Sequence, residues 1–183
     1  MSNPTRPNIL WYCTDQQRFD TIGALGNEFV RTPTIDRIVE EGVAFTHAYC
    51  QSPICTPSRS SFMTGMYSSR VHNSRNGNDT FPDQPPVITK LIAESGYNCG
   101  MVGKFHLQSS GYRTEPRIDD GFSYWRFSHA PRDDWEEGHH YAEWVKARGG
   151  DLNAMRESPE RVSTEFHQTT WASDCAIEFI NQQ

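Results

Sequence analysis

The alternation of short apolar runs with amphipathic helix patterns constrains the fold of this sequence more than any other feature. Strand-type apolar runs occupy residues 8–13, 43–50 and 97–103. Residues 32–42 begin with Thr-Pro and end with Gly around an amphipathic pattern, and residues 87–96 form a second amphipathic segment that ends in Ser-Gly. This order is typical of βαβ units, in which helices connect parallel strands. We therefore predict an α/β fold with a mostly parallel sheet flanked by helices on both faces.

The remaining sequence is less regular. Residues 108–160 are rich in Gly, Pro, Arg, Asp and aromatic residues, which predicts long ordered loops with one helix near residues 140–148. A final helix is expected from about residue 162 or later to the end of the chain. Three strands are few for a sheet that is covered on both faces. We therefore expect residues 1–183 to be the N-terminal part of a larger domain.

Charge and length argue against several classes of protein. The formal net charge is −6 at pH 7, which argues against a nucleic-acid partner. No apolar run approaches the length that crosses a bilayer, so no membrane partner is expected. The opening residues, MSNPTRPNIL, lack the charged and apolar regions of a secretory signal. We expect a cytoplasmic protein, or an exported one whose signal has been removed.

The five cysteines do not indicate a disulfide framework, because their number is odd and no signal precedes them. Cys13 and Cys99 lie inside apolar runs and are expected to be small buried hydrophobic residues. Cys55 lies instead in the segment Cys-Thr-Pro-Ser-Arg, residues 55–59. Neither packing nor turn chemistry explains that order of residues, so the segment is a candidate functional motif.

Polar side chains follow the ends of all three predicted strands. Asp15 and Gln16 come after the first strand, Cys55 follows the second, and Lys104 and His106 follow the third. In open parallel sheets, ligands bind outside the carboxyl ends of the strands. We therefore expect these three segments to converge on one crevice.

The segment around Cys55 suits nucleophilic attack next to an anion. Pro57 is typical of the first residue of a helix, which places Cys55 at the helix N-terminus. Free N–H groups and the helix dipole favour anions there. Arg59, one turn further on, adds a guanidinium fork that matches an oxyanion. The sequence therefore predicts a nucleophile beside a tetrahedral anion.

The other two segments suit metal binding and charge stabilisation. Asp15 and Gln16 offer a carboxylate and an amide oxygen, which are hard ligands for Ca²⁺ or Mg²⁺. Two ligands are too few for a metal site, so further ligands must come from elsewhere. Lys104 supplies a point cation and His106 a proton donor or carrier, both useful against charge on a leaving group.

These motifs resemble those of the formylglycine-dependent sulfatases of the alkaline phosphatase superfamily. The C-T-P-S-R of residues 55–59 matches their C-x-P-S-R signature, and a Thr-Gly follows it, as in the family. Four fixed residues in five arise by chance on the order of once per few hundred thousand positions. The other similar segments are residues 7–20 (first strand and metal loop), 32–50 (first helix and second strand), 96–107 (the G-K-x-H-L segment) and, more weakly, 120–122 and the last helix.

The resemblance implies a specific chemistry for Cys55. In this family a maturation enzyme reads Cys-x-Pro-x-Arg and oxidises the cysteine to formylglycine, an aldehyde that hydrates to a gem-diol. One hydroxyl attacks sulfur and forms a covalent sulfate hemiester. The second hydroxyl then loses its proton, the aldehyde re-forms and sulfate leaves. A sulfated small molecule or glycan is the implied substrate.

The resemblance also implies a role for each motif residue. Asp15, Gln16 and Cys55 match metal ligands, with Ca²⁺ favoured over Mg²⁺, and Cys55 is also the nucleophile. The other matching positions are Arg59 (support of the hydrated aldehyde), Lys104 (sulfate), His106 (the hydrate or the ester oxygen), Asn76 (substrate side) and, less firmly, Ser128 or His129 (another substrate contact). The family's remaining metal ligands, a second His and a second Lys would lie beyond residue 183. The domain is thus implied to be the N-terminal part of a sulfatase catalytic domain, inactive by itself.

Departures from the family pattern leave other functions open. Many sulfatases have Asp-Asp where this chain has Asp15-Gln16, and Gln occurs there in some members and in the related phosphonate monoester hydrolases. A phosphonate or phosphate diester hydrolase is therefore an alternative, although those hydrolases depart from the Lys and His that this chain keeps at 104 and 106. A non-catalytic binding domain on the same scaffold is a third possibility.

Some residues that could have a functional role are better explained by a structural one. His47, Cys50 and Cys55 form a zinc-like spacing but lack a fourth ligand, so zinc is disfavoured. His139 and His140 are expected at the surface without a metal. One aromatic group could line a sugar-binding surface, but we expect it to pack a long loop onto the core; its members are Phe122, Tyr124, Trp125, Phe127, Trp135 and Tyr141.

Overall fold

The structure, a computed structural model, describes residues 6–71, 75–111, 115–130, 137–158, 160 and 162–183. The chain divides into two compact units, residues 1–49 and residues 50–183.

The first unit contains a 3₁₀ turn, η1 (Gly23–Leu25), and helix α1 (Pro33–Glu41). The predicted helix is confirmed, with Pro33 at its start and Gly42 after its end. Thr32 links the two elements: its Oγ1 accepts a 2.8 Å hydrogen bond from the Gly23 N–H and donates one to Asp36 Oδ1. A side chain beside the helix start thus fixes the turn against the helix.

The prediction of two strands in the first 50 residues is wrong. Residues 8–13 and 43–50 form no strand ladder in the described part of the chain. Their large apolar side chains are exposed, among them Leu10, Trp11 and Phe45. The physical reason is that an apolar run becomes a strand only where a neighbouring strand pairs with its N–H and C=O groups, and sequence periodicity carries no information about that partner.

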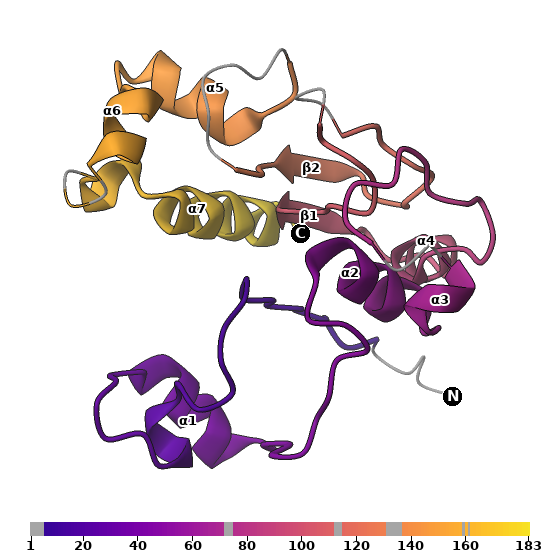
Figure 1. Cartoon of the computed structure of the whole chain (residues 1–183), viewed down its shortest axis with the longest axis horizontal. Helices are drawn as coiled ribbons and strands as arrows, with labels where there is room; N and C mark the ends of the chain where they lie inside the picture. Colours follow the sequence, from indigo (N-terminus) through magenta and orange to yellow (C-terminus); the bar gives the residue numbers. More distant parts are fainter. Residues whose placement is uncertain (1–5, 72–74, 112–114, 131–136, 159, 161) are drawn as a thin grey trace. The chain divides into compact units, whose positions relative to one another are not determined.

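The second unit is built on a small parallel sheet (Figure 1). Strand β1 (Gly100–Gly103) pairs with β2 (Tyr124–Phe127), with Gly100 opposite Tyr124 and Gly103 opposite Phe127. The predicted third strand is therefore confirmed, although it begins at Gly100 rather than at residue 97. β2 falls in a region predicted as loops, although its aromatic residues favour strands.

Successive side chains of each strand point to opposite faces, and the helices follow that division. Met101 and Phe127 belong to one hydrophobic cluster, whereas Val102 packs against another. The first cluster also contains residues of α2 (Cys55–Thr64) and α3 (Ser68–Val71), and α4 (Ile88–Glu94) contacts α2. The opposite face is covered by α5 (His140–Ala147), α6 (Leu152–Glu157), the 3₁₀ turn η3 (Thr164–Phe166) and α7 (Gln168–Asn181). The prediction of a parallel sheet with helices on both faces is confirmed.

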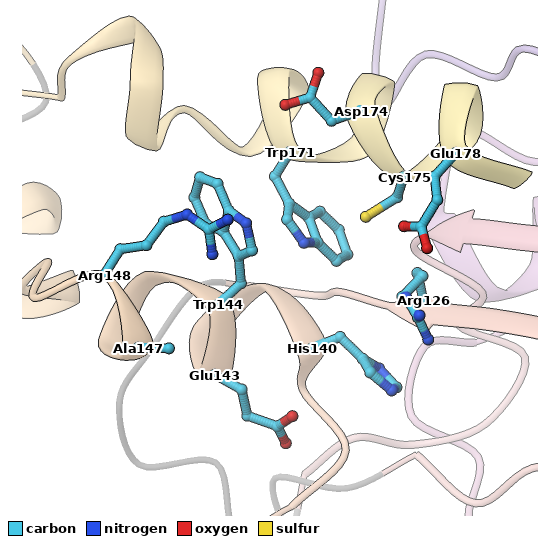
Figure 2. Close-up of a pocket in the computed structure, with 10 residues that line it drawn as sticks. All are labelled: Arg126, His140, Glu143, Trp144, Ala147, Arg148, Trp171, Asp174, Cys175 and Glu178. Carbon is cyan, nitrogen blue, oxygen red and sulfur yellow. The ribbon is translucent and has the colours of Figure 1, made fainter.

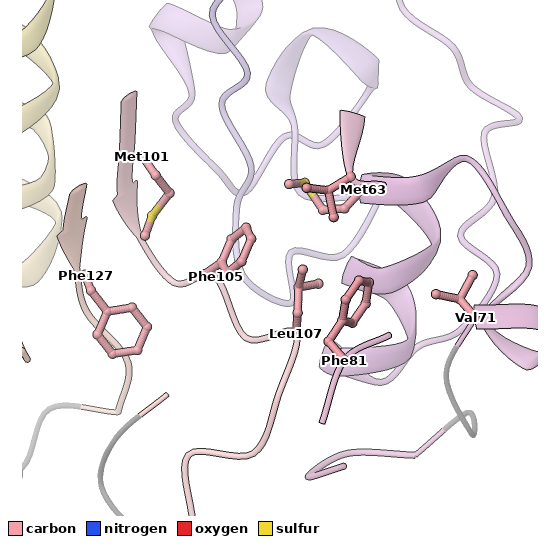
Figure 3. Packing of buried hydrophobic residues seen from close by; sticks show 8 residues of the cluster. Met63, Val71, Phe81, Met101, Phe105, Leu107 and Phe127 are labelled. Carbon is pink, nitrogen blue, oxygen red and sulfur yellow. The ribbon is translucent and has the colours of Figure 1, made fainter. Parts of the chain in front are cut away.

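The core on the α2 side joins helices, strands and the segment after β1 (Figure 3). Figure 3 shows Phe105 and Leu107 directed into the space between Met101 and Met63. The buried members of this cluster are Met63, Val71, Phe81, Val87, Met101, Phe105, Leu107 and Phe127. The residues that flank His106 in sequence are thus anchored in the core.

The core on the other side is aromatic. Tyr141, Val145 and Trp171 are buried, and the Tyr141 hydroxyl donates a 2.8 Å hydrogen bond to the Phe166 carbonyl. The α5 and C-terminal helices were predicted near these positions, whereas α3 and α6 were not. The aromatic group was expected to pack onto the core, and this is confirmed for Phe122, Tyr124, Trp125, Phe127 and Tyr141; Trp135 lies outside the described residues.

Candidate active site

Cys55 is the first residue of α2 and is a half-buried free thiol. The helix begins two residues before the predicted start, because Pro57 occupies the third helical position, where its missing N–H is still without consequence. Gly65 ends the helix as predicted, with a left-handed φ of 68° and a 2.8 Å hydrogen bond from its N–H to the Ser61 carbonyl. Cys55 therefore lies at the positive end of a complete helix.

Asn76 caps this end of α2. Ile54, the N-cap residue, makes no side-chain cap, and Asn76 Oδ1 instead accepts a 2.9 Å hydrogen bond from the Thr56 N–H. The loop that carries Asn76 is itself fixed, because the carbonyl of the buried Asn78 accepts a 2.7 Å hydrogen bond from the Ser109 N–H. The predicted substrate-side residue thus lies beside the predicted nucleophile, and it organises the backbone there.

Arg59 connects α2 to the end of β1. Its side chain is buried, and its guanidinium donates a hydrogen bond to the carbonyl of Lys104. Lys104 follows directly after β1, whose last residue, Gly103, has a left-handed φ of 101°. Two motif segments separated by 45 residues are therefore in direct contact.

His106 is held in an unusual backbone conformation by a carboxylate. Its φ is 54°, in the left-handed region that non-glycine residues seldom adopt. Glu115 accepts hydrogen bonds from the N–H groups of His106 (2.9 Å), Leu107 (2.7 Å) and Gln108 (3.4 Å). Burial raises the pKa of Glu115 to about 7, although these hydrogen bonds and the charge of Arg59 act in the opposite direction.

The segment after β2 lies against the segment after β1. The Ser128 N–H donates a 2.9 Å hydrogen bond to the Gly103 carbonyl, and the rings of His106 and His129 are 4.4 Å apart between centroids and nearly perpendicular. Gln168, the first residue of α7, donates hydrogen bonds to Ser128 Oγ and to the His129 carbonyl. The carboxyl ends of the two parallel strands therefore bring a pair of histidines together.

His139 was predicted at the surface, and this is wrong: its side chain is buried. Nε2 faces the His129 N–H at 3.0 Å and Nδ1 faces the Ala142 N–H at 3.1 Å. Burial lowers the pKa of His139 to about 4. The sequence gives no signal for this burial, because it results from the packing of α5 behind the end of β2.

Asp15 and Gln16 lie in the first unit, and both are exposed. Gln16 has a left-handed φ of 55°, a conformation that is enriched at functional turns. An exposed carboxylate next to an exposed amide fits part of a hard-cation site. Among the described residues no group of three or more His, Cys, Asp or Glu residues could hold a metal ion. A metal site formed by Asp15, Gln16 and Cys55 draws on both units and stays a prediction.

A surface pocket of about 530 Å³ lies between α5 and α7 (Figure 2). Trp144 and Trp171 line it together with charged side chains, including Arg126 of β2 and Glu178 of α7. None of the motif residues predicted from sequence lines this pocket. The chemistry predicted from the motifs is therefore not located there.

Two cysteines differ from their predicted environments. Cys13 is exposed and Cys99 is half-buried, whereas both were expected to be buried. Cys13 is exposed because the apolar run that contains it has no strand neighbour. Cys175, in α7, is the buried one.

Comparison with known proteins decides the family. The model of the sulfatase family matches residues 7–170. The chain belongs to the sulfatase family. An ulvan-active sulfatase of Formosa agariphila is 36% identical over 127 residues, which cover 67% of this chain and 24% of that protein. An N-acetylglucosamine-6-O-sulfatase of Bacteroides thetaiotaomicron is 32% identical over 146 residues, covering 75% of this chain and 25% of that protein.

A solved structure shares the fold of this chain. The crystal structure of a phosphonate monoester hydrolase of Agrobacterium radiobacter superposes with a TM-score of 0.70 at 20% identity, covering 97% of this chain and 38% of that one. The sulfatase segment thus has an alkaline-phosphatase-like fold and spans about a quarter of the length of the two curated relatives above. No helix in the described ranges is long and apolar enough to cross a membrane.

Reasoning from the sequence missed two residues of this candidate site. Glu115 and Gln168 each hold backbone or hydroxyl groups of a motif segment in place. Neither belongs to a recognisable motif. Glu115 binds a residue nine positions before it, and Gln168 binds one that lies 40 positions before it. Only the folded structure could reveal them.

Proposed function

We propose that these residues are the N-terminal part of a sulfatase catalytic domain that hydrolyses sulfate esters through a formylglycine at position 55. The observation that carries the proposal is the contact between the Arg59 guanidinium and the Lys104 carbonyl. It joins the helix that presents Cys55 to the strand end that presents Lys104 and His106. This contact supports the assignment of the signature and the G-K-x-H-L segment to one site.

The covalent steps use residue 55 itself. One hydroxyl of its hydrated aldehyde attacks sulfur, the S–O bond to the substrate breaks, and the alcohol leaves. The second hydroxyl then gives up its proton, the carbonyl re-forms, and the C–O bond to the sulfate breaks. Arg59 supports the hydrated aldehyde, Lys104 holds the sulfate oxygens, and His106 donates a proton toward the ester oxygen or stabilises the hydrate.

A divalent cation is part of the proposal, and the family resemblance favours Ca²⁺ over Mg²⁺. Asp15 and Gln16 would hold it together with the modified residue 55 and ligands beyond residue 183. When bound, such a cation supplies Lewis-acid polarisation of the nucleophilic oxygen. A formylglycine-generating maturation enzyme is the implied partner that reads the Cys55 segment.

The substrate class follows from the relatives by analogy. One relative is named for activity on ulvan and another for a sulfated N-acetylglucosamine. We propose that this protein acts on a sulfated glycan or another small sulfated molecule. Lys104 and the N-terminus of α2 supply the positive charge that the sulfate group needs.

Mass spectrometry of the peptide containing residue 55 tests the modification directly. The protein should be produced at full length together with a competent maturation enzyme, and we expect residue 55 to be converted to formylglycine. Persistent cysteine under these conditions would favour a non-catalytic binding domain instead.

Turnover of two model substrates separates the proposal from the phosphonate alternative. A specific observation favours the alternative, namely Gln16 in place of the second Asp that many sulfatases have. We expect full-length protein to hydrolyse p-nitrophenyl sulfate faster than a phenylphosphonate monoester, because Lys104 and His106 are both retained. The reverse preference would assign the site to phosphonate or phosphate diester hydrolysis.

A further inference from the structure

The turn that carries Lys104 and His106 is organised around the carboxylate of Glu115. Oε2 accepts a 2.9 Å hydrogen bond from the His106 N–H, and Oε1 accepts one of 2.7 Å from the Leu107 N–H. A third N–H, that of Gln108, lies 3.4 Å from Oε1. Three successive N–H groups therefore converge on one carboxylate, an arrangement that favours an anion at its centre.

This arrangement accounts for the backbone of His106. A left-handed φ of 54° costs a non-glycine residue on the order of 1–2 kcal/mol. The hydrogen bonds that the Glu115 carboxyl group accepts from three successive N–H groups offset that cost. Without the carboxylate, the three N–H groups would turn toward other acceptors and the residue could return to a negative φ.

Phe105 and Leu107 limit such a change to His106. Both side chains are buried in the cluster of Figure 3, so the chain on each side of His106 is anchored by packing. The His106 ring, by contrast, lies against His129 across the strand ends. A rotation of this one residue would move the ring while the core stayed intact.

Glu115 also lies within the electrostatic influence of Arg59, whose guanidinium is bound to the carbonyl of Lys104. The carboxylate and the guanidinium thus act on adjacent peptide groups of the same turn. Together the two side chains hold the backbone of Lys104 and His106, the two catalytic candidates of this turn.

We propose that Glu115 is a positioning residue of the hydrolytic site, which acts by holding His106 in its left-handed conformation. This inference rests on the proposed function, because it assigns Glu115 to the sulfate-ester reaction through His106. Glu115 itself does not touch the reacting atoms.

The test is a double-mutant cycle in the full-length protein with Glu115→Gln and His106→Ala, assayed with p-nitrophenyl sulfate under steady-state conditions. Glu115→Gln keeps the shape of the side chain but removes the charge and one acceptor. We expect it to lower kcat by about 10- to 100-fold while KM changes by less than about threefold. In the His106→Ala background the same change should lower kcat by less than about twofold, because the group it positions is gone.

Equal effects of Glu115→Gln in both backgrounds would overturn the proposal, as would unchanged kcat or a loss explained entirely by unfolded protein. Glu157→Gln, an exposed glutamate in α6, is the matched control and should leave kcat unchanged.

Crystal structures of the wild type and of Glu115→Gln provide a readout that does not need activity. We expect the φ of His106 to leave the left-handed region in the variant, or its ring to move away from His129. A variant in which both are unchanged would overturn the positioning role even if the protein hydrolysed no sulfate ester. Conversely, an inactive wild type with an altered His106 in the variant would refute the proposed function alone.

Discussion

Oδ1 of Asn76 accepts a 2.9 Å hydrogen bond from the backbone N–H of Thr56, so a side chain 20 residues away closes the first turn of the helix that begins at Cys55. A residue that the family resemblance places on the substrate side therefore also has a structural role.

Replacing Asn76 should separate these two roles. Asn76→Ala removes the cap and is expected to destabilise the protein by about 1 kcal/mol, and to lower kcat/KM by roughly tenfold as the turn loosens. Asn76→Asp keeps the acceptor and should preserve stability, but it should lower activity because it places a negative charge near the sulfate. Urea unfolding and steady-state kinetics measure both effects. Asn181→Ala, at the exposed end of α7, is the control, and an Asn76→Ala variant identical to wild type in both measurements would refute the capping role.

Cys55→Ala should abolish turnover without unfolding the protein. Loss of the nucleophile is expected to lower kcat by at least about 10³-fold. The side chain lies at a helix start and is only half-buried, so the free energy of unfolding should change by less than about 1 kcal/mol. Cys50→Ala changes an exposed free cysteine and should retain full activity. Normal turnover by Cys55→Ala would remove the proposed mechanism.

Gly100→Ala should disturb the contact between β1 and α7. A Cβ at this position would lie 2.8 Å from Cε1 of the Phe179 ring, closer than real contacts allow. We expect a loss of about 1–3 kcal/mol in urea unfolding of the full-length protein. Phe179→Leu should make the Gly100→Ala change less costly, because the smaller side chain leaves room for the new methyl group. If the cost of Gly100→Ala is the same with either residue at 179, the steric explanation is incorrect.

His139 should make stability depend on pH. Its pKa is lowered to about 4 in the folded protein, from an ordinary value near 6.5. The unfolded chain therefore binds more protons between about pH 4 and 6.5, and stability falls as the pH decreases through that window. The full loss is on the order of 3 kcal/mol and is reached below about pH 4.

Glu115 acts in the opposite direction over an overlapping range. Its pKa is raised to about 7 in the folded protein, so its contribution falls as the pH increases from about 4.5 to 7. The informative quantity is therefore the difference between wild type and His139→Asn, which keeps a cap acceptor but cannot titrate. We expect the variant to lose the acid-side decrease between pH 6.5 and 4, measured by urea unfolding at each pH. Parallel curves for the two proteins would show that His139 does not titrate with folding.

The 183-residue chain by itself should be poorly stable. Ile9, Leu10, Trp11 and Tyr12 are exposed, and each of the two strands in the described sheet has an unpaired outer edge. Exposed apolar runs and open strand edges promote association. We expect the isolated chain to bind a hydrophobic dye and to melt broadly or aggregate. A sharp cooperative melt of a monomer would contradict this expectation.

The sequence by itself determined the local chemistry of this protein. Thr32-Pro33 and Gly42 define α1, Gly65 ends α2, and Cys55 with Arg59 forms the sulfatase signature. These features could be predicted because each depends on residues within a few positions of one another, through fixed φ angles, caps and helical spacing. The order of strands and helices likewise predicted a parallel sheet, although its strand β2 was not predicted.

Only the tertiary structure decided which distant groups meet. It formed no strand from residues 8–13 in the described part of the chain, buried His139 behind β2, and brought Glu115 to His106 and Arg59 to Lys104. Backbone N–H and C=O groups are the same at every residue, so a sequence pattern does not reveal which acceptor a given N–H will find. That choice is made when the chain packs, because burial then forces each polar group to take the partner that lies nearest to it.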